Sequence, residues 1–302
     1  MRPIYFDCST AMARTLTPEL LARCPALEVA MDDPNRDVLL ARIADREIVV
    51  LGKTVLGAAE LARLPRLRHI VFLGTGASSY VDLTAAAAQG ITVHVVPGYG
   101  SRAVAEHALA LMLACARQIV PMDRAIRAGG FPSLHGMELA GKTLGLVGLG
   151  DIGAEVARLG AALGMDVVAW TRGGDARGAP ARLLPLDEVF ACAHIVSLHV
   201  ALTPETRGLV DARRLSLMRA GSLLINTARG AVVDEAALVS ALERGTPAAA
   251  GLDVFVDEPP APDHPLRRLD NVVLTGHAAF RTPEASRRLV ERVFAIVNDL
   301  LR

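Results

Sequence analysis

Short apolar segments alternate with longer amphipathic ones along most of the chain. In the first hundred residues, runs of aliphatic and β-branched residues predict strands, and helices such as 18–23 and 55–63 separate them. Regular alternation of strand and helix is typical of a parallel sheet covered by helices on both faces. The expected strands of this first domain cover residues 4–6, 27–30, 48–51, 69–73 and 92–96.

A second series of the same kind follows the break Pro-Gly-Tyr-Gly at residues 97–100. Ser101 is placed to cap a long helix that runs from Ala103 to about Ile119. Thr282 as N-cap and Pro283 at the first helical position begin a last helix, which we expect to return to the N-terminal domain. The strands between cover 144–147, 166–170, 195–199, 223–227, 250–255 and 272–275, about as many as a Rossmann fold has.

Composition and charge exclude several classes of function. Lys and Arg together number 32, as do Asp and Glu, so no overall field attracts nucleic acid or an anionic membrane. The apolar runs are short and interrupted, and Asp7 comes before any signal-peptide core could form, so we expect neither a membrane span nor a leader. The cysteines are widely spaced without a CxxC pair, which indicates reduced thiols in a cytoplasmic protein. They are Cys8, Cys24, Cys115 and Cys192.

A glycine-rich turn joins the first strand of the second series to the helix after it. Gly148, Gly150 and Gly153 fit the G-x-G-x-x-G pattern. The first glycine allows a tight turn, the second lets a pyrophosphate approach the amides at the helix N-terminus, and the third lets the helix pack closely on the strand. Such turns also occur without a ligand, but the strand before and the helix after supply the context that dinucleotide binding requires.

Polar side chains follow the later strands of this series. Arg229 comes after the fourth strand, Glu258 lies in the loop after the fifth, and His277 comes after the sixth. Ligands of open α/β sheets bind at the carboxyl ends of the strands, which is the edge that carries the glycine turn. An arginine, a carboxylate and a histidine at that edge are suited to act on a small anion beside a nicotinamide.

Several unrelated motifs in the same order resemble the D-isomer-specific 2-hydroxyacid dehydrogenases. The resemblance spans nearly the whole chain. It implies an α/β protein with two doubly wound parallel-sheet domains, in which a Rossmann NAD(P)-binding domain (98–277) is inserted into a flavodoxin-like substrate domain (1–97 and 278–302). The motifs are AVAEH at 103–107, GKTLG at 141–145, VGLGDIG at 147–153, SLHV at 197–200, NTARG at 226–230, LDVF at 252–255 with Glu258-Pro259, and His277.

The resemblance implies an oxidoreductase that transfers a hydride between NAD(P)H and a small 2-oxo acid or D-2-hydroxy acid. Arg229 would bind the substrate carboxylate with its planar, permanently charged guanidinium. His277 would be the acid/base, and Glu258 would orient the imidazole and stabilise its cationic form. From the residues alone, Arg229 remains open to a surface role, Glu258 to that of a solvated loop acid, and His277 to that of a loop cap.

Substrate and cofactor contacts follow from the same resemblance. Gly74, Thr75 and Gly76 lie where the family's N-terminal domain offers backbone amides to the carboxylate, and His277 and Arg229 complete that site. Cofactor contacts are expected from Gly148, Gly150, Asp151, Ile152, Gly153, Thr171, Arg172, His199, Val200, Thr206, Thr227, Ala228 and Asp253.

Thr171 stands where NAD-preferring members carry an acid for the ribose 2′-hydroxyl, with Arg172 next to it and Arg177 nearby. Loss of the acid removes repulsion toward a 2′-phosphate, and an arginine can pair with it. We therefore expect either NADP or NAD as cofactor, with NADP(H) favoured. His107 and His199 are interpreted as supports for local hydrogen bonding or for the cofactor pocket. The other histidines are interpreted as structural and no metal is expected; they are His69, His94, His135, His194 and His264.

The hydroxyl-rich segment 74–80 favours a small polar 2-oxo acid such as glyoxylate or hydroxypyruvate. Formate dehydrogenases are disfavoured because they carry glutamine in place of Glu258, and phosphoglycerate dehydrogenases with regulatory tails because the chain stops at the closing helix. Gly276 replaces a frequent proline, and His-Ala-Ala-Phe at 277–280 resembles the C-terminal-binding corepressors. A nucleotide-sensing binding protein without significant turnover is thus the alternative. The segment from Ala103 to Leu139 resembles the family's dimer arm, so we expect a homodimer.

Overall fold

The computed structural model describes residues 2–32, 35–176 and 178–302. The chain divides into two compact units, which are Met1–Gly100 with Arg281–Arg302 (unit 1) and Ser101–Phe280 (unit 2). Residues 98–100 and 278–280 thus lie on the other side of the boundaries expected from the sequence. Hydrogen bonds explain both shifts. In unit 1 the Arg288 side chain donates to the Tyr99 carbonyl oxygen, and in unit 2 the Asp253 carboxylate accepts from the Ala278 and Ala279 amides.

Unit 1 contains a parallel five-stranded sheet in the order β2-β1-β3-β4-β5, the flavodoxin-like order. Its strands are β1 (Ile4–Tyr5), β2 (Glu28–Val29), β3 (Ile48–Leu51), β4 (His69–Phe72) and β5 (Thr92–His94). The helices of this unit are α1 (Thr10–Ala13), α2 (Pro18–Leu21), α3 (Arg36–Ile43), α4 (Ala58–Leu61), α5 (Leu83–Ala88) and α12 (Pro283–Leu300), with a 3-10 turn at Ala77–Ser79.

The C-terminal helix α12 begins as its sequence predicts. The Thr282 side chain accepts a hydrogen bond from the Ala285 amide, and Pro283 takes the first helical position. The helix buries Leu289, Val293 and Val297 on one face. This apolar face, together with the bonds from its arginines, places α12 in unit 1.

Unit 2 contains a parallel seven-stranded sheet in the order β12-β11-β10-β9-β6-β7-β8. From β6 the strands are added first toward one edge, as β7 and β8, and then toward the other, from β9 to β12. The point between β6 and β9 is therefore the topological switch point of a Rossmann fold. The predicted fold class is confirmed. The strands are β6 (Thr143–Val147), β7 (Asp166–Trp170), β8 (Arg182–Leu183), β9 (Ile195–Leu198), β10 (Leu223–Asn226), β11 (Ala249–Leu252) and β12 (Val272–Leu274). The short strand β8 is an addition to the strands expected from the sequence.

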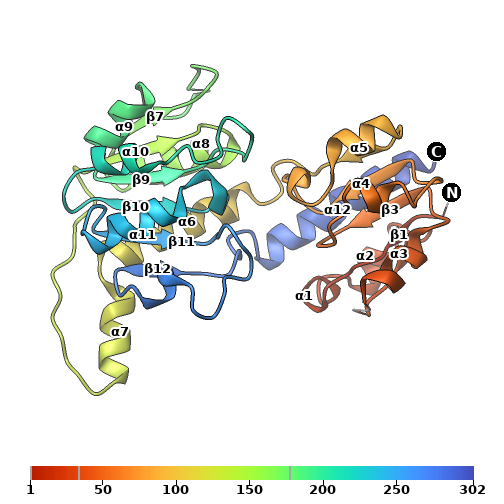
Figure 1. Cartoon of the computed structure of the whole chain (residues 1–302), viewed down its shortest axis with the longest axis horizontal. Coiled ribbons are helices and arrows are strands. Elements are labelled where there is room, and N and C mark those ends of the chain that lie inside the picture. Colours follow the sequence, from red (N-terminus) through yellow and green to blue (C-terminus); the bar gives the residue numbers. More distant parts are fainter. Residues whose placement is uncertain (1, 33–34, 177) are drawn as a thin grey trace. The chain divides into compact units, whose positions relative to one another are not determined.

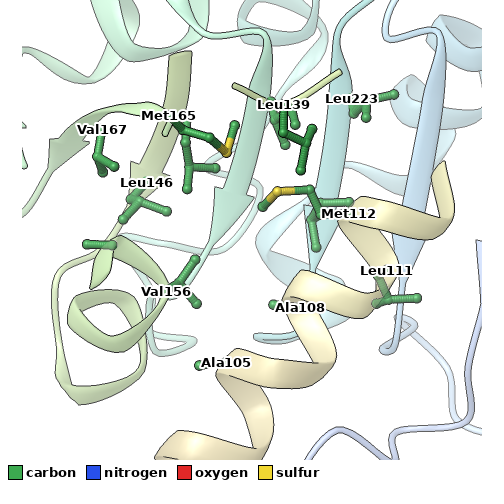
Figure 2. Packing of buried hydrophobic residues seen from close by; sticks show 14 of the residues in the cluster. Ala105, Ala108, Leu111, Met112, Leu139, Leu146, Val156, Met165, Val167 and Leu223 are labelled. Atoms are coloured by element: carbon green, nitrogen blue, oxygen red, sulfur yellow. The ribbon is translucent and has the colours of Figure 1, made fainter. Parts of the chain in front are cut away.

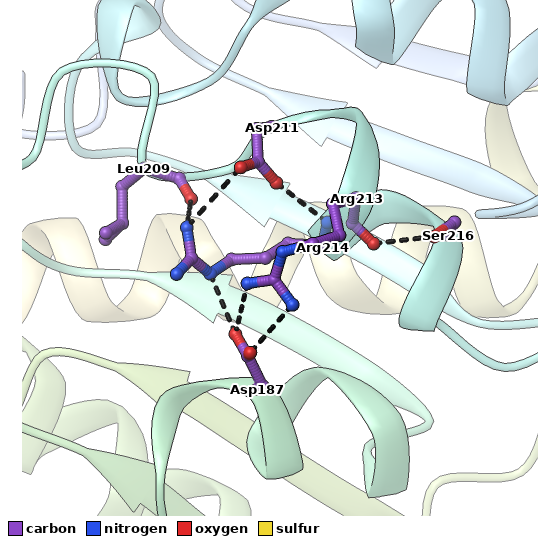
Figure 3. A network of polar contacts seen from close by, with 6 residues as sticks. All are labelled: Asp187, Leu209, Asp211, Arg213, Arg214 and Ser216. Carbon is purple, nitrogen blue, oxygen red and sulfur yellow. Dashed lines mark hydrogen bonds and ion pairs between the residues drawn. The ribbon is translucent and has the colours of Figure 1, made fainter.

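Helices cover both faces of this sheet. On one face α6 (Ser101–Ala116) and α8 (Asp151–Ala162) pack against the strands. Figure 2 shows Ala105, Ala108 and Met112 of α6 turned toward Leu146 and Val156, where small residues allow close approach. On the other face α9 (Leu186–Cys192) and α10 (Ala212–Leu217) are joined by ion pairs from Arg213 and Arg214 to Asp187, at 2.8 and 3.0 Å (Figure 3), and α11 (Glu235–Glu243) lies beside α10.

The long helix predicted from Ala103 to about Ile119 is wrong at both ends. The helix α6 begins at Ser101 itself and ends at Ala116, and Gln118 adopts a left-handed conformation with φ of 54°. A second helix, α7 (Ile119–Arg127), then leaves at an angle of 63° and carries the yellow segment away from the sheet (Figure 1). Within the described residues no single helix is long and apolar enough to cross a membrane, and only α6 and α7 taken together have the length and composition.

Candidate active site

The glycine turn between β6 and α8 has the geometry that its sequence predicts. Gly148 has φ of 105°, a conformation that side chains with a Cβ rarely adopt. A Cβ on Gly153 would lie 2.1 Å from the Gly148 carbonyl oxygen, so this glycine permits the close packing of helix on turn. A Cβ on Gly150 would meet no atom within 4 Å. The amide end of α8 is therefore open at Gly150, as an approaching phosphate requires.

Other residues expected at the cofactor follow the neighbouring strands. Thr227, directly after β10, has a buried Oγ1 without a hydrogen-bond partner among the described residues, which suits a contact with a bound molecule. Thr171 and Arg172 follow β7, whereas Arg177 lies outside the described residues. The Thr206 hydroxyl donates to the Ala201 carbonyl oxygen at 2.6 Å and accepts from the Thr203 amide. Its hydroxyl is thus already used within its own turn.

His199 follows β9 beside the glycine turn. Desolvation by the surrounding protein lowers its pKa to about 4, so the ring is neutral near pH 7. Its Nε2 lies 2.9 Å from the Ser197 hydroxyl, and its carbonyl oxygen would be 2.6 Å from a Cβ on Gly148. These contacts agree with the interpretation of His199 as a support of the cofactor turn. They give it no part in proton transfer.

The structure brings His277 and Glu258 together within unit 2. Nδ1 of His277 lies 2.6 Å from Oε2 of Glu258, and Oε1 of the same carboxylate accepts from the Phe255 amide at 3.1 Å. Burial opposes ionisation of Glu258, but the hydrogen bonds from His277 and Phe255 and the charges of His277 and Arg229 outweigh it and lower its pKa. The carboxylate is therefore ionised at neutral pH and anchors the imidazole through one nitrogen.

His277 occupies a strained turn that Asp253 holds in place. Its φ of 49° is unusual for a residue with a side chain, and its own amide donates to the Asp253 carbonyl oxygen at 2.7 Å. The fully buried Asp253 carboxylate accepts from the Ala278 and Ala279 amides, each at 2.9 Å, and from the Thr275 hydroxyl at 2.6 Å. The turn that presents His277 is thus fixed on both sides by one aspartate.

A further contact links this turn to α6. The His107 Nε2 lies 3.0 Å from the Thr275 hydroxyl and 3.5 Å from Asp253 Oδ1. Burial of Asp253 raises its pKa, but the hydrogen bonds from His107, Thr275 and the two amides outweigh burial, and the pKa is lowered. His107 therefore supports local hydrogen bonding, as interpreted from the sequence. The carboxylate oxygens of Asp253 are already engaged by the turn. The expected contact of Asp253 with the nicotinamide stays a prediction.

The Arg229 turn packs against the Glu258 loop. Asn226 side-chain atoms bind the Ala228 amide and the Arg229 carbonyl oxygen, each at 3.0 Å, so one buried amide shapes the turn. A Cβ on Gly230 would lie 1.9 Å from the Phe255 carbonyl carbon, which only glycine avoids. The Arg229 guanidinium donates to the Ala228 carbonyl oxygen at 2.6 Å. Asn226, Gly230 and Thr275 were not assigned to the site from the sequence, although the first two belong to the NTARG motif.

The segment expected to bind the substrate carboxylate lies in unit 1, after β4. The Gly74 carbonyl oxygen accepts from the Val96 amide, while within the described residues the Thr75 and Gly76 amides form no backbone hydrogen bond. Nearby in the same sheet, the buried Asp7 carboxylate accepts from the Gly52, Lys53 and Thr54 amides, each at 2.8 Å. Unit 1 therefore carries ordered loops at the carboxyl ends of β1 and β3.

In the described part of the chain, no three His, Cys, Asp or Glu residues are grouped as a metal site, and all four cysteines are free. Comparison with known proteins then decides the family. The model described as "D-isomer specific 2-hydroxyacid dehydrogenase, NAD binding domain" matches residues 109–279, more than half of the chain. The chain belongs to the D-isomer-specific 2-hydroxyacid dehydrogenase family. The resemblance seen in the motifs is confirmed.

Members of this family that the chain is similar to differ in length. D-3-phosphoglycerate dehydrogenase of Mycobacterium tuberculosis is 42% identical over 268 residues, which cover 85% of this chain and 50% of the relative. The chain thus spans about half the length of these relatives. Hydroxypyruvate reductase of Thermotoga maritima is 37% identical over 91% of this chain and 93% of the relative. Among solved structures, an acyclic imino acid reductase in complex with NADPH and D-Arg has a TM-score of 0.90 and 28% identity, and the match covers 100% of this chain and 97% of that one.

Proposed function

We propose that this protein is a nicotinamide-dependent D-2-hydroxyacid dehydrogenase that reduces a small 2-oxo acid, with His277 as the acid/base. The observation that carries the proposal is the 2.6 Å contact between His277 Nδ1 and the Glu258 carboxylate. An imidazole whose Nδ1 is bound to an ionised acid has its Nε2 left for the substrate. Arg229, close enough to act on the charge of Glu258, is the nearby cation for the substrate carboxylate.

Each residue of this set has a separate part in the reaction. The bound nicotinamide supplies or accepts the hydride. Nε2 of His277 gives a proton to the carbonyl oxygen as the 2-hydroxy acid forms, and takes it back in the reverse direction. Glu258 stabilises the imidazolium while the ring is charged. Arg229 binds the substrate carboxylate and polarises the neighbouring oxo group through its planar fork of donors.

The described residues fit a nicotinamide dinucleotide. Open space at Gly150, and the Thr227 hydroxyl, which has no partner among the described residues, suit the pyrophosphate and its neighbours. The amides near Asp151 and Ile152, with Val200 and Ala228, would line the rest of the site. We propose that NADPH is preferred because Thr171 and Arg172, and no acid, directly follow β7. The similar imino acid reductase, whose structure is a complex with NADPH, supports this proposal.

We propose glyoxylate or hydroxypyruvate as substrate class. The similar protein of nearly equal length is named a hydroxypyruvate reductase. In this proposal the Thr75 and Gly76 amides, which form no backbone hydrogen bond within the described residues, are the additional donors to the carboxylate, and Gly74 leaves room for its close approach. A nucleotide-sensing binding protein without turnover is not favoured, because His277 is bound to Glu258, the charge of Arg229 acts on Glu258, and the relatives are named as dehydrogenases and reductases.

We also propose that the protein works as a cytoplasmic homodimer, with unit 1 as the substrate domain and unit 2 as the nucleotide domain. Exposed apolar residues on α7 and the segment after it support the dimer. Phe131 is 94% exposed, and Ile119 and Ile126 are about half exposed. Isolated large apolar side chains are common on surfaces, but a series along one protruding arm is typical of an interface.

The test is consumption of NADPH and NADH over a panel of 2-oxo acids. We expect turnover with glyoxylate and hydroxypyruvate, and a lower KM for NADPH than for NADH. His277→Gln should lower kcat by about 10²- to 10⁴-fold, the usual contribution of general acid/base catalysis, while NADPH still binds. Arg229→Gln should raise KM as well as lower kcat.

The exposed His135 offers a matched control, because His135→Gln makes the same chemical change elsewhere in unit 2. This variant should retain the wild-type rate. If His277→Gln retains most of the rate, the proton-transfer role is wrong. If no 2-oxo acid is reduced although the dinucleotide binds, the proposed activity itself is wrong.

A further inference from the structure

A polar cavity lies in unit 2 at the edge of the sheet opposite to the glycine turn. Its volume is about 410 Å³. We call it the amino-edge pocket, because three of its lining residues directly precede strands. It is lined by Gly136, Met137, Glu138, Ala140, Lys142, His194, Arg219, Ala220, Gly221 and Ser222.

The sheet itself gathers the polar lining residues. Lys142 precedes β6, His194 precedes β9, and Ser222 precedes β10, and these three strands are neighbours in the order β10-β9-β6. The strands pair in register, with Ile195 opposite both Leu144 and Leu223. In Figure 2, Leu223 and Leu139 mark this end of the core. The three residues therefore stand in a row on rigid elements.

The pocket has two cationic side chains, Lys142 and Arg219, and one acid in its lining. Within the described residues, neither Lys142 nor Arg219 forms an ion pair, and Arg219 donates only to the Cys192 carbonyl oxygen at 3.5 Å. The one acid in the lining, Glu138, is exposed. Desolvation first, and then the charges of Arg219 and Lys142, lower the pKa of His194. Lys142 and Arg219 are therefore close enough to His194 to oppose its protonation.

The uncharged groups of the pocket also offer hydrogens. The Thr143 amide donates to Nδ1 of His194 at 3.0 Å, so a neutral His194 carries its proton on Nε2. The buried Ser222 hydroxyl has no hydrogen-bond partner in the described part of the chain. A buried hydroxyl without a partner costs free energy that an oxygen acceptor would recover after rotation about one bond.

We propose that the amino-edge pocket binds a small oxyanion, in the form of a phosphate or carboxylate group of a metabolite. A guanidinium fork, an ammonium and an imidazole N–H that line one pocket, with a single exposed acid among them, are groups that recognise such anions. The pocket is separated from the glycine turn by the five residues of β6, about 16 Å at 3.3 Å per residue. It is therefore a second site, and it goes beyond the proposed dehydrogenase activity.

The first test is thermal unfolding with inorganic phosphate and, in a parallel series, malonate, each compared with sodium chloride at equal ionic strength. An anion that binds the native state raises Tm with concentration. We expect a rise in wild type that the double variant Lys142→Gln/Arg219→Gln loses, with affinity lower by about tenfold or more. Arg172→Gln is the matched control, since it removes a cation at the proposed nucleotide site and should keep the response.

The two anions distinguish the chemistry of the ligand. A response to phosphate alone assigns a phosphate group, a response to malonate alone assigns a carboxylate, and a response to both assigns an oxyanion of either kind. The proposal is overturned if neither anion acts beyond chloride, or if the double variant responds as wild type does. It is also overturned if Arg172→Gln alone abolishes the response, since the anion then binds at the nucleotide site.

A second measurement covers a double variant that fails to fold. Arg219 is exposed, so the single variant Arg219→Gln should fold. In NMR titrations of wild type, with the His194 signal assigned through His194→Gln, phosphate or malonate should raise the pKa of His194, and Arg219→Gln should weaken that effect. An unchanged His194 titration contradicts the proposal. Neither measurement needs turnover, so their failure leaves the proposed enzyme activity untouched.

Discussion

Units 1 and 2 use the same device at the carboxyl edges of their sheets. In unit 1 the buried Asp7 carboxylate accepts three successive amides of the loop after β3. In unit 2 the buried Asp253 carboxylate accepts two successive amides of the turn after β12. In both, a carboxylate fixes the loop of a neighbouring strand, because each amide so bound is satisfied without water.

The two loops differ in what they present. The Asp7 loop consists of Gly52, Lys53 and Thr54 and contains none of the proposed proton-transfer groups. The Asp253 turn carries His277, and its aspartate has side-chain partners in Thr275 and His107 besides the amides. A buried carboxylate that binds successive backbone amides can therefore order a loop, as at Asp7, or also fix the position of a proposed catalytic side chain, as at Asp253. From this comparison we infer that Asp253 positions His277.

The largest effect is expected from Asp253→Asn. The side-chain NH₂ of asparagine would face one of the two backbone amides, those of Ala278 and Ala279, which now donate to the carboxylate. The turn that carries His277 would then be held less firmly. We expect kcat to fall by about 100-fold, since small misplacement of a catalytic group costs this much. KM for the 2-oxo acid and the Kd for NADPH, measured by fluorescence, should change little.

Asp270→Asn, at an exposed aspartate of unit 2, is the control and should behave as wild type. A loss of NADPH affinity in Asp253→Asn, with kcat unchanged at saturation, would instead support the expected contact with the nicotinamide. That result would show that Asp253 does not act by positioning His277.

A smaller and different effect is expected from Asp7→Asn. The same chemical change should lower the free energy of unfolding by about 1–3 kcal/mol, because a buried loop amide loses its acceptor. Since the clamped loop carries no proton-transfer group, kcat should stay within about threefold of wild type. Urea unfolding and steady-state kinetics on the same preparation measure both. A fall in kcat equal to that of Asp253→Asn would show that the two clamps do not differ as inferred.

The smallest effect is a pH dependence of stability at Glu258. Its pKa in the folded protein lies below the ordinary value of 4.5, so its ionised form stabilises the fold above pH 4.5. This contribution is lost as pH falls from 4.5 through the folded pKa. Glu258→Gln should thus be less stable than wild type near pH 7 by up to about 1 kcal/mol, a limit set by its partial exposure.

Urea unfolding at a series of pH values measures this difference. It should be constant near neutrality and shrink below pH 4.5. A difference that grows as the pH falls would contradict the assigned direction of the Glu258 pKa.

Much of the unit 2 sheet could be predicted because buried parallel strands are short apolar runs. Residues 166–170 were expected as a strand and are β7. The two-residue β8 was missed, since Arg182 and Leu183 form no such run. The end of α6 was also missed, although Pro121, three residues after the left-handed Gln118, is a signal for a break in a helix.

The sequence pointed to the polar groups of the candidate site but not to the residues that support them. Arg229, Glu258 and His277 were predicted because each follows a strand at the same edge, and the structure brings His277 and Glu258 into contact, while their roles stay predictions. The partners of Asp253 depend on how the turn after β12 folds back on β11, which periodicity does not report. The same holds for Gly230, whose need for glycine comes from a contact with Phe255 twenty-five residues away in sequence.

The φ of 49° at His277 has a consequence for how this position is maintained. Glycine and asparagine tolerate that backbone better than an imidazole-bearing residue does, so folding on its own favours replacement of the histidine. The proposed proton transfer at His277 opposes such a replacement. Under that proposal, the stability of the turn and the rate of turnover favour different residues at this position.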